Sequence, residues 1–161
     1  MIYDNTTVRR QDRLLDEPRA RELLQKGEYG LLSLVDLQGN PYGIPINYVW
    51  DGHGHIYLHC APEGKKLNCI KLHREVSFCV VGRTHVVSDK FTTGYECIVV
   101  KCRAQIGLSA DERRHALRLF LDKYSPADKE VGLKYAEKSF HRTEIIRLDI
   151  QEFSGKQKKV D

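Results

Sequence analysis

The clearest pattern in the chain is an alternation of apolar and polar residues with a period of two, which is typical of β-strands. It is most regular in the stretch ECIVVKCRAQI, residues 96–106. One face of this predicted strand is apolar and carries Ile98, Val100, Cys102, Ala104 and Ile106. The other face starts apolar and then becomes polar, so we expect it to be half covered; it carries Cys97, Val99, Lys101, Arg103 and Gln105.

The stretch HIYLHCA, residues 55–61, alternates in the same way. His55, Tyr57 and His59 fall on one face, whereas Ile56, Leu58 and Cys60 fall on the other. The pattern therefore predicts a strand with a functional side and an apolar side. Apolar runs bounded by turn residues predict further strands in residues 30–36, 42–50, 76–82 and 144–153.

Pro45 interrupts one of these predicted strands. Because proline has no backbone N–H, it indicates an edge strand, a bulge, or backbone that faces something other than a neighbouring strand. The sequence leaves these three interpretations open.

Sequence signals for helices lie between the predicted strands. Asp16 is suited to cap a helix that ends at Gly27. Ser109 and Glu112 have the spacing of a capping box and open a second helix. Short helices are also predicted in residues 63–73 and after Ser125.

Together these elements predict an α+β fold that is mainly β, a small antiparallel barrel with flanking helices. The chain has 161 residues, the usual length of one domain, and no repeat or linker divides it. We therefore expect a single domain over residues 1–161. Residues 1–12 and 155–161 are polar, and we expect them to be loosely attached termini.

Composition adds limits to this picture. A net charge of +4 indicates solubility rather than a nucleic-acid surface, and much of the excess lies in the last residues. Five cysteines without paired spacing indicate free thiols in a reducing compartment. Without an apolar signal segment or a run long enough to cross a bilayer, the protein is expected in the cytoplasm, with neither membrane nor nucleic acid as a partner.

The stretch HCAPEGKKLNCIKLH, from His59 to His73, combines histidines and cysteines. His59 and Cys60 are adjacent on a predicted strand, so their side chains point to opposite faces and would not easily share one ion. Cys60 and Cys69 also lack the spacing of a structural zinc site. We therefore expect no metal here.

The same stretch holds Gly64, Lys65 and Lys66 at the start of a predicted helix. Glycine lets the backbone approach an anion closely, and a helix start offers unpaired N–H groups. Lysines are unfavourable at a helix N-terminus unless an anion lies nearby. From the local sequence, a phosphate site and a solvated Gly-Lys-Lys turn are equally well supported.

No catalytic triad, C-x-x-C or dinucleotide-binding motif is present. The chain nevertheless resembles the flavin-binding split-barrel superfamily that includes pyridoxamine 5'-phosphate oxidase. Within it, the chain is most similar to the nitroimidazole-resistance (Nim) proteins. Four stretches carry the resemblance, in the family's order and spacing: VRRQDR, GEYGLLSLVDLQGNPYGIPINYVW, IYLHCAPEGKKLNCI and KFTTGYECIVVKCRA.

The resemblance implies a six-stranded antiparallel split barrel that forms a homodimer, with two flavin sites at the subunit interface. The cofactor would be FMN, with FAD as the alternative. The implied cofactor-binding residues are Pro45, Ile46, Asn47 and Tyr48 beside the ring, His59, Cys60, Gly64, Lys65 and Lys66 near the ribityl chain and phosphate, and Glu96 and Cys97 from the partner subunit.

This chain also departs from the family. The long strand begins Tyr95, Glu96, Cys97, where the Nim pattern has serine as the third residue. The vitamin B6 contacts of the oxidase have no match at the C-terminus, including residues 143–153, so we do not expect vitamin B6 oxidation.

The resemblance implies a flavin-dependent oxidoreductase that passes electrons from a donor such as a reduced nicotinamide to a small electrophile, for example a nitroaromatic. His59 is the expected catalytic residue, because an imidazole can transfer a proton near neutral pH. The alternative role of His59 is only to hydrogen-bond the cofactor. The alternative function of the protein is that of a non-enzymatic flavin or haem binder for storage or sensing.

Overall fold

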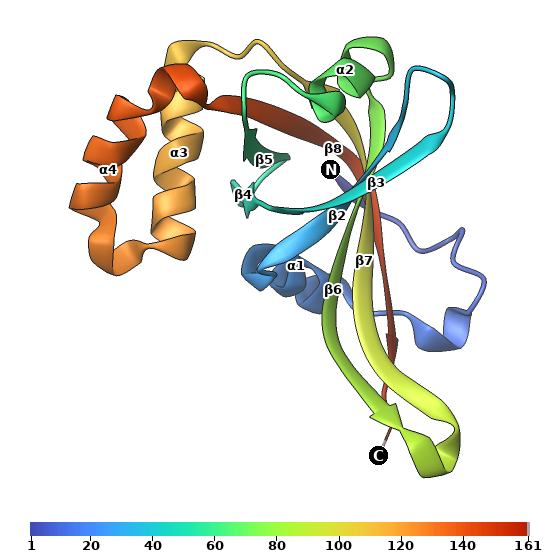
Figure 1. The fold of residues 1–161 in the computed structure, drawn as a ribbon. Coiled ribbons are helices and arrows are strands. Elements are labelled where there is room, and N and C mark those ends of the chain that lie inside the picture. Colours follow the sequence, from blue (N-terminus) through green and yellow to red (C-terminus); the bar gives the residue numbers. More distant parts are fainter. Residues whose placement is uncertain (161) are drawn as a thin grey trace.

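The computed structural model describes residues 1–160 and shows a strongly curved, mainly antiparallel sheet with helices around it (Figure 1). The strands are β1 (Ile2–Tyr3), β2 (Tyr29–Val35), β3 (Pro41–Asn47), β4 (Val49–Trp50), β5 (His55–Cys60), β6 (Glu75–Val87), β7 (Thr92–Gln105) and β8 (Glu144–Lys158). The α-helices are α1 (Glu17–Lys26), α2 (Lys65–Leu72), α3 (Ala110–Tyr124) and α4 (Lys129–Lys138). This confirms the expected mainly-β α+β class.

The sheet has the order β3-β2-β6-β7-β8-β5-β4, and β1 pairs with β8 in parallel. It therefore contains eight strands rather than the expected six, because two-residue strands, β1 and β4, are added to six longer ones. The far strands β3 and β5 approach each other without backbone pairing, which brings the two sides of the curved sheet together. The β6–β7 hairpin continues beyond this body as a long arm (Figure 1).

The terminal segments differ from the expectation of loose attachment. Ile2 and Tyr3 pair with β8, and the Gly155 N–H donates to the Asn5 side chain at 3.0 Å. β8 itself continues to Lys158, which lies opposite Tyr95 of β7. Polar composition misled the sequence interpretation, because backbone pairing holds both ends, and Met1 and Tyr3 also pack against the main core. Residue 161 lies outside the described residues.

Two of the predicted helix caps are confirmed. The Asp16 carboxylate accepts a hydrogen bond from the Arg19 N–H at 2.9 Å at the start of α1. The Ser109 hydroxyl accepts one from the Glu112 N–H at 3.2 Å at the start of α3. Each bond satisfies an amide that would otherwise lack a partner at a helix start.

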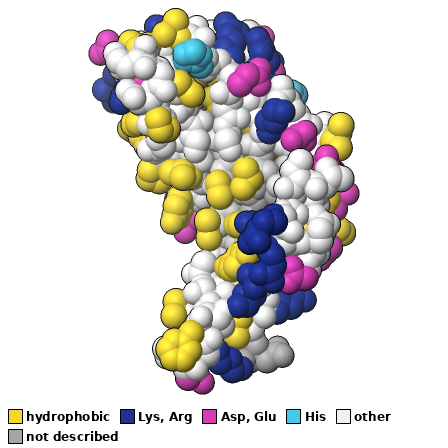
Figure 2. Space-filling view, turned by 90° about the vertical axis from the view of Figure 1, so that its right-hand side faces the viewer, with side chains coloured by type: hydrophobic (Ala, Val, Ile, Leu, Met, Phe, Trp, Pro, Cys, Tyr) yellow, Lys and Arg dark blue, Asp and Glu magenta, His cyan; other side chains and the backbone are white. Residues whose placement is uncertain are grey.

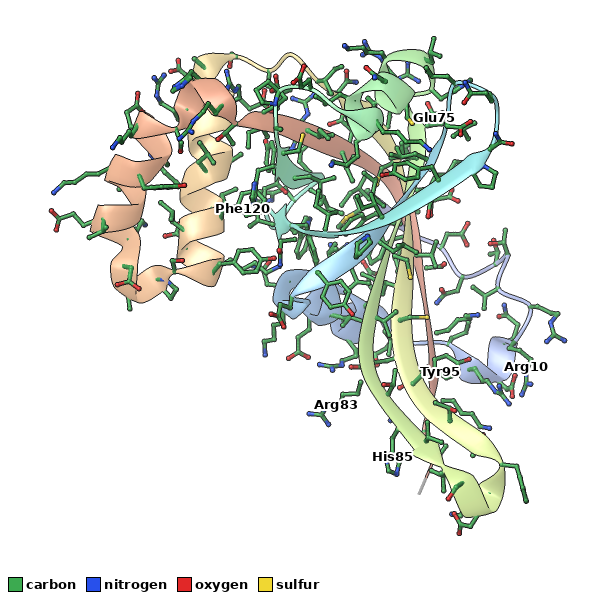
Figure 3. The ribbon with its side chains drawn as sticks, viewed as in Figure 1. Arg10, Glu75, Arg83, His85, Tyr95 and Phe120 are labelled. Atoms are coloured by element: carbon green, nitrogen blue, oxygen red, sulfur yellow. The ribbon has the colours of Figure 1, made fainter. Side chains whose placement is uncertain are left out.

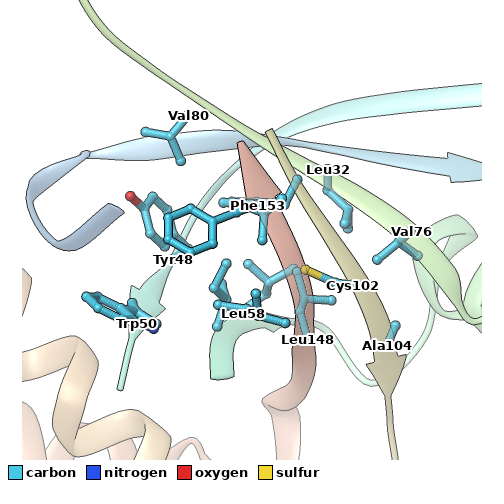
Figure 4. Packing of buried hydrophobic residues seen from close by; sticks show 14 of the residues in the cluster. Leu32, Tyr48, Trp50, Leu58, Val76, Val80, Cys102, Ala104, Leu148 and Phe153 are labelled. Atoms are coloured by element: carbon cyan, nitrogen blue, oxygen red, sulfur yellow. The ribbon is translucent and has the colours of Figure 1, made fainter. Parts of the chain in front are cut away.

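The main core fills the inside of the curved sheet, where Tyr48, Leu58, Cys102 and Phe153 meet (Figure 4). The predicted inner face of the long strand is confirmed, since Ile98, Val100, Cys102 and Ala104 are all fully buried. A second, smaller core lies between β5, β8 and α3; it contains Val49, Tyr57, Ala116, Phe120 and Ile145.

β5 is consequently covered on both faces. Ile56 and Leu58 enter the main core, whereas Tyr57 enters the second core beneath α3. The predicted alternation is therefore confirmed, and it assigns the His59 side of the strand to the helical pair α3–α4.

None of the helices in residues 1–160 combines the length and the apolar character needed to cross a bilayer.

Candidate functional site

The start of α2 has an open, cationic geometry. Gly64 is its N-cap residue, with φ +138°, a conformation that favours glycine. A Cβ at Gly64 would meet no atom within 4 Å, so the space in front of the helix is unobstructed. Within the described residues no side chain caps the helix, and its first turn has no acidic residue. Its first N–H groups therefore remain available to an anion.

Lys65 and Lys66 stand at this helix start. The Lys65 Nζ lies 4.3 Å from the centre of the Tyr42 ring and 3.8 Å from the Asp36 Oδ2. Hydrogen bonds from the Asn40 and Gln38 N–H groups, together with Lys65, lower the pKa of Asp36. The Asp36 carboxylate stands beside Lys65, but the first turn of α2 holds two lysines and no acidic residue, which leaves an excess of positive charge. This excess fits a bound phosphate.

Asp36 and Tyr42 were not expected at this site. The residues from Asp36 to Asn40 predict a turn that leads into β3. The position of this turn beside α2 depends on how the sheet curves, which the sequence does not show. The signal that could have suggested it is the Asp–Gly–Asn composition of the turn, which favours a locally hydrogen-bonded carboxylate.

Cys60 ends β5 close to this helix start. Its side chain is half-buried, and burial raises the pKa of the thiol, although the nearby Lys66 opposes the shift. The thiol is therefore protonated at neutral pH and behaves as a small packed side chain rather than as a nucleophile.

His59 lies on the opposite side of β5 and faces α3. Its ring meets the Phe120 ring edge-on, with 4.8 Å between the ring centres. Within residues 1–160 its ring nitrogens have no hydrogen-bond partner. Burial lowers the pKa of His59 below its usual value of 6.5, so the imidazole is neutral at pH 7. A neutral imidazole can both donate and accept a proton.

The segment from Pro45 to Tyr48 contains exposed, half-buried and fully buried side chains. Pro45 and Asn47 point outward from the edge strand β3, and the Asn47 Nδ2 donates to the Glu28 carbonyl at 3.0 Å. Ile46 is half-buried against the main core. The edge position is sufficient to explain Pro45, because the outer side of β3 has no strand to pair with.

Tyr48 is a core residue. Its side chain is fully buried, and its hydroxyl donates to the Leu24 carbonyl at 2.6 Å. Its backbone N–H donates to the Tyr124 hydroxyl at 3.1 Å, and its carbonyl accepts from the Lys123 Nζ at 2.9 Å. Both backbone polar groups of Tyr48 are thus satisfied by α3 within the chain itself.

Lys123 and Tyr124 are the residues that sequence reasoning missed. Burial lowers the pKa of Lys123 to about 8, and its Nζ lies 3.8 Å from the centre of the Tyr48 ring. The apolar repeat of α3 includes Phe120 and Tyr124, but it cannot show which strand the helix covers. The contact joins residues about 75 positions apart in the chain.

Glu96 and Cys97 point to opposite faces of β7. The Glu96 carboxylate receives two hydrogen bonds from Arg19 of α1, at 2.6 and 3.0 Å, and one from the Arg83 N–H at 3.2 Å. These bonds lower the pKa of Glu96. Cys97 faces outward and is half-buried, and burial raises the pKa of its thiol.

The structure thus brings some of the predicted residues together and separates others. Cys60, Gly64, Lys65 and Lys66 gather around the start of α2. Pro45 and Cys97 share the outer face of the sheet, but β2 and β6 lie between their strands, which puts them about 14 Å apart at the usual strand spacing.

No group of three or more His, Cys, Asp or Glu side chains in residues 1–160 has an arrangement that could hold a metal ion. Glu144 lies opposite Cys60 in β8 and contributes negative charge beside that thiol.

A family profile described as "Pyridoxamine 5'-phosphate oxidase" matches residues 16–157. No curated protein gives a significant match.

Several solved structures share the fold. One, from Bacteroides thetaiotaomicron VPI-5482, is described as a candidate 5-nitroimidazole antibiotic resistance protein; it is 18% identical, with a TM-score of 0.72 over 90% of this chain and 86% of that one. An FAD-binding protein from Mesorhizobium loti is 22% identical, with a TM-score of 0.64 over 91% and 98%. The FAD and heme binding protein from Mycobacterium smegmatis is 18% identical, with a TM-score of 0.68 over 90% and 72%.

Proposed function

This chain belongs to the pyridoxamine 5'-phosphate oxidase family, and from that membership we propose that it binds a flavin, FMN in the first instance. The observation that carries the proposal is the start of α2. It combines a glycine cap, uncapped amides and two lysines in a turn without acidic residues. Without a bound anion, those lysines would be electrostatically unfavourable there.

The proposed activity is that of a flavin-dependent reductase of small electrophiles such as nitroaromatics, with a reduced nicotinamide as electron donor. A bound flavin supplies the electron transfer. This chain's own residues would hold the phosphate at Gly64, Lys65 and Lys66 and shape the surroundings of the ring with Pro45, Ile46, Asn47 and Tyr48. His59, a neutral imidazole, would hold or supply a proton beside the reacting molecule.

The absorption spectrum of the purified protein tests the cofactor, because flavin and haem absorb differently. Mass analysis of the released cofactor then distinguishes FMN from FAD. Anaerobic bleaching by a reduced nicotinamide, followed by recovery on adding a nitroaromatic, is the result expected of the reductase. A flavin that stays oxidised with every donor would contradict the activity but not the binding.

Two substitutions test the phosphate site directly. Replacing Lys65 and Lys66 together by Ala removes two charge-assisted contacts, so FMN affinity should fall at least about tenfold and become less sensitive to salt. Lys71→Ala is the matched control, because Lys71 is exposed in the last turn of the same helix. Equal FMN affinities of the double variant and the control would show that Lys65 and Lys66 do not bind the flavin phosphate.

A second candidate function is a non-enzymatic flavin or haem binder acting in storage or sensing. The likeness to the FAD and heme binding protein from M. smegmatis favours it. In that case the spectrum would show a bound chromophore that neither a nicotinamide nor a nitroaromatic changes.

We further propose that the working unit is a homodimer with the flavin at the subunit interface. Apolar side chains on the outer face of the sheet support this; Tyr29, Leu31, Val81 and Val99 are all exposed. They form rows across the sheet, since Leu31 lies opposite both Pro45 and Cys79, and Cys79 lies opposite Val99. Pro45 and Cys97 lie on this same face, so a second copy that covers the face would contact both residues.

We also propose a cellular compartment and partners for the protein. All five cysteines are free thiols, which favours a reducing compartment such as the cytoplasm. The expected partners are small molecules and a second copy of the chain, not a membrane or a nucleic acid.

A further inference from the structure

A cavity of about 430 Å³ lies between α3, α4 and the ends of β5 and β8. It is separate from the open space at the start of α2. The two helices stand side by side at one end of the molecule, and Phe120 points from α3 toward the strands (Figure 3). This volume is within the range of sites that bind small organic molecules.

The walls of the cavity are mainly apolar and aromatic. The floor is formed by Phe120, which is buried, and by His59, which stays exposed at the end of β5. α3 adds Leu117 and Leu121, and the α4 side carries Val131 and Tyr135. Planar walls of this kind favour an aromatic ligand, because rings pack edge-on or offset against one another.

α4 itself indicates a missing partner. It has no buried residue, and the side chains of Val131 and Tyr135 are each 69% exposed although they border the cavity. Gly132 allows α4 to approach α3 closely at one point, since a Cβ there would lie 2.5 Å from the Leu121 side chain. The helices are thus held together at Gly132, while the apolar residues beside it remain uncovered.

The charges around the cavity indicate what kind of molecule fits. Asp128 is the single charged side chain among the lining residues, and it is exposed to solvent at the edge. At the floor, His59 is neutral at pH 7 and its ring nitrogens have no partner within the described residues. Neither an anion nor a cation would find a desolvated counter-charge here, whereas a hydroxyl or carbonyl group could bond to the imidazole.

We propose that this cavity is a binding site for a small, uncharged aromatic molecule, with its ring between Phe120 and Tyr135 and one polar group on the His59 imidazole. The cavity shares His59 with the reductase site of the proposed function, but binding of the aromatic molecule does not require a flavin. His59 points away from Cys60, whose thiol lies on the Lys66 side of β5, so the cavity and the start of α2 are on opposite faces of one strand.

The test uses 1-naphthylmethanol with its charged counterparts, 1-naphthylmethylamine and 1-naphthoate, titrated into the full chain by calorimetry and followed by protein NMR. The uncharged alcohol should bind at least about tenfold more tightly than either ion. Resonances of α3 and α4 should shift on binding.

Ala136→Phe fills the cavity from the half-buried side of α4 and should lower the alcohol's affinity at least about tenfold. Lys134→Phe adds the same ring on the exposed side of that helix and should leave the affinity within twofold. His59→Ala should weaken the alcohol about three- to tenfold, the effect of one hydrogen bond, but should not weaken 1-methylnaphthalene.

Three results would overturn the inference: no binding of the alcohol at millimolar concentration, equal binding by the Ala136→Phe and Lys134→Phe variants, or displacement of the alcohol by FMN. The last result would assign the cavity to the flavin site. If the protein binds no flavin but binds the alcohol as described, the proposed function fails and this inference stands.

Discussion

Glu96 lies where α1 crosses β7, and its carboxylate holds the two elements together. The Glu96 side chain is 13% exposed and makes two bonds to Arg19. Arg19 also pairs with Glu22, but that carboxylate is 42% exposed. The same guanidinium thus takes part in a largely buried pair and in an exposed one, which are expected to differ in energy.

Replacing Glu96 by Gln should therefore lower the free energy of unfolding by about 1–3 kcal/mol at pH 7, because Arg19 loses its buried counter-charge. Glu22→Gln is the control and should change it by about 0.5 kcal/mol or less. Urea denaturation of the flavin-free protein measures both. Equal effects of the two substitutions would contradict this role of Glu96.

The same pair has a defined pH dependence. The pKa of Glu96 is lowered in the folded protein, so its contribution is fully present above the unfolded value of about 4.5 and is lost as pH falls through the folded pKa. The stability difference between the natural protein and Glu96→Gln should shrink below about pH 4.5. A constant difference down to pH 3 would show that Glu96 acts by packing.

Residue-scale chemistry was only partly predictable from the sequence. Gly64, Lys65 and Lys66 form a local motif, so the cationic helix start could be inferred before the fold was known. The partners of Glu96 and Tyr48 could not, because Arg19 and Tyr124 are about 75 positions away in the chain. Such contacts depend on how the sheet curves.

At the scale of elements, the neighbouring strands β2 and β6 meet at Gly30, where the Phe78 ring of β6 takes up the space of a side chain. A Cβ on Gly30 would lie 2.4 Å from the Phe78 ring and 2.9 Å from the Cys79 carbonyl oxygen. Phe78 is fully buried beside Tyr48, with 5.0 Å between ring centres, so it has little room to move away. The packing of the Phe78 ring on β2 thus requires glycine at position 30.

Gly30→Ala should lower the free energy of unfolding by about 2–4 kcal/mol through overpacking. Gly43→Ala, on the adjacent strand, is the control, since its new Cβ would come no closer than 3.7 Å to Leu31. That substitution should be neutral or slightly stabilising. Similar thermal unfolding of the two variants would show that the Phe78 ring can shift.

The elements themselves were predicted unevenly, and for a physical reason. Caps such as Asp16 and Ser109 act within one turn, and strand alternation acts within a few residues, so both are readable locally. The pairing of β8 with β7, β5 and β1 joins distant segments and left no local signal. For that reason the polar end of β8 was taken for a loose tail.

At the scale of the whole molecule, one face of the sheet remains apolar and uncovered. Figure 2 shows hydrophobic side chains at the surface of one face, next to a stripe of lysine and arginine. Arg10 and Arg83 lie on either side of the β6–β7 arm in Figure 3. An apolar surface with a charged border is typical of a protein interface.

Leu31→Glu tests the proposed dimer, because it places a charge in the outer row that Leu31 forms with Pro45 and Cys79. At micromolar concentration the natural protein should sediment as a dimer and the variant as a monomer with at least about tenfold weaker FMN binding. Leu133→Glu introduces the same charge on exposed α4 and should remain dimeric. A natural protein that is monomeric while holding FMN tightly would contradict the interface.

The position of β8 also governs when the sheet can form. Residues 144–158 come last among the strands, yet they lie between β7 and β5. During synthesis on the ribosome, β7 and β5 therefore keep unpaired edges until residues 144–158 have emerged. Their apolar faces stay exposed for that time, and the long-range pairing makes folding slow. Expression yield should thus depend on chaperones that shield nascent chains.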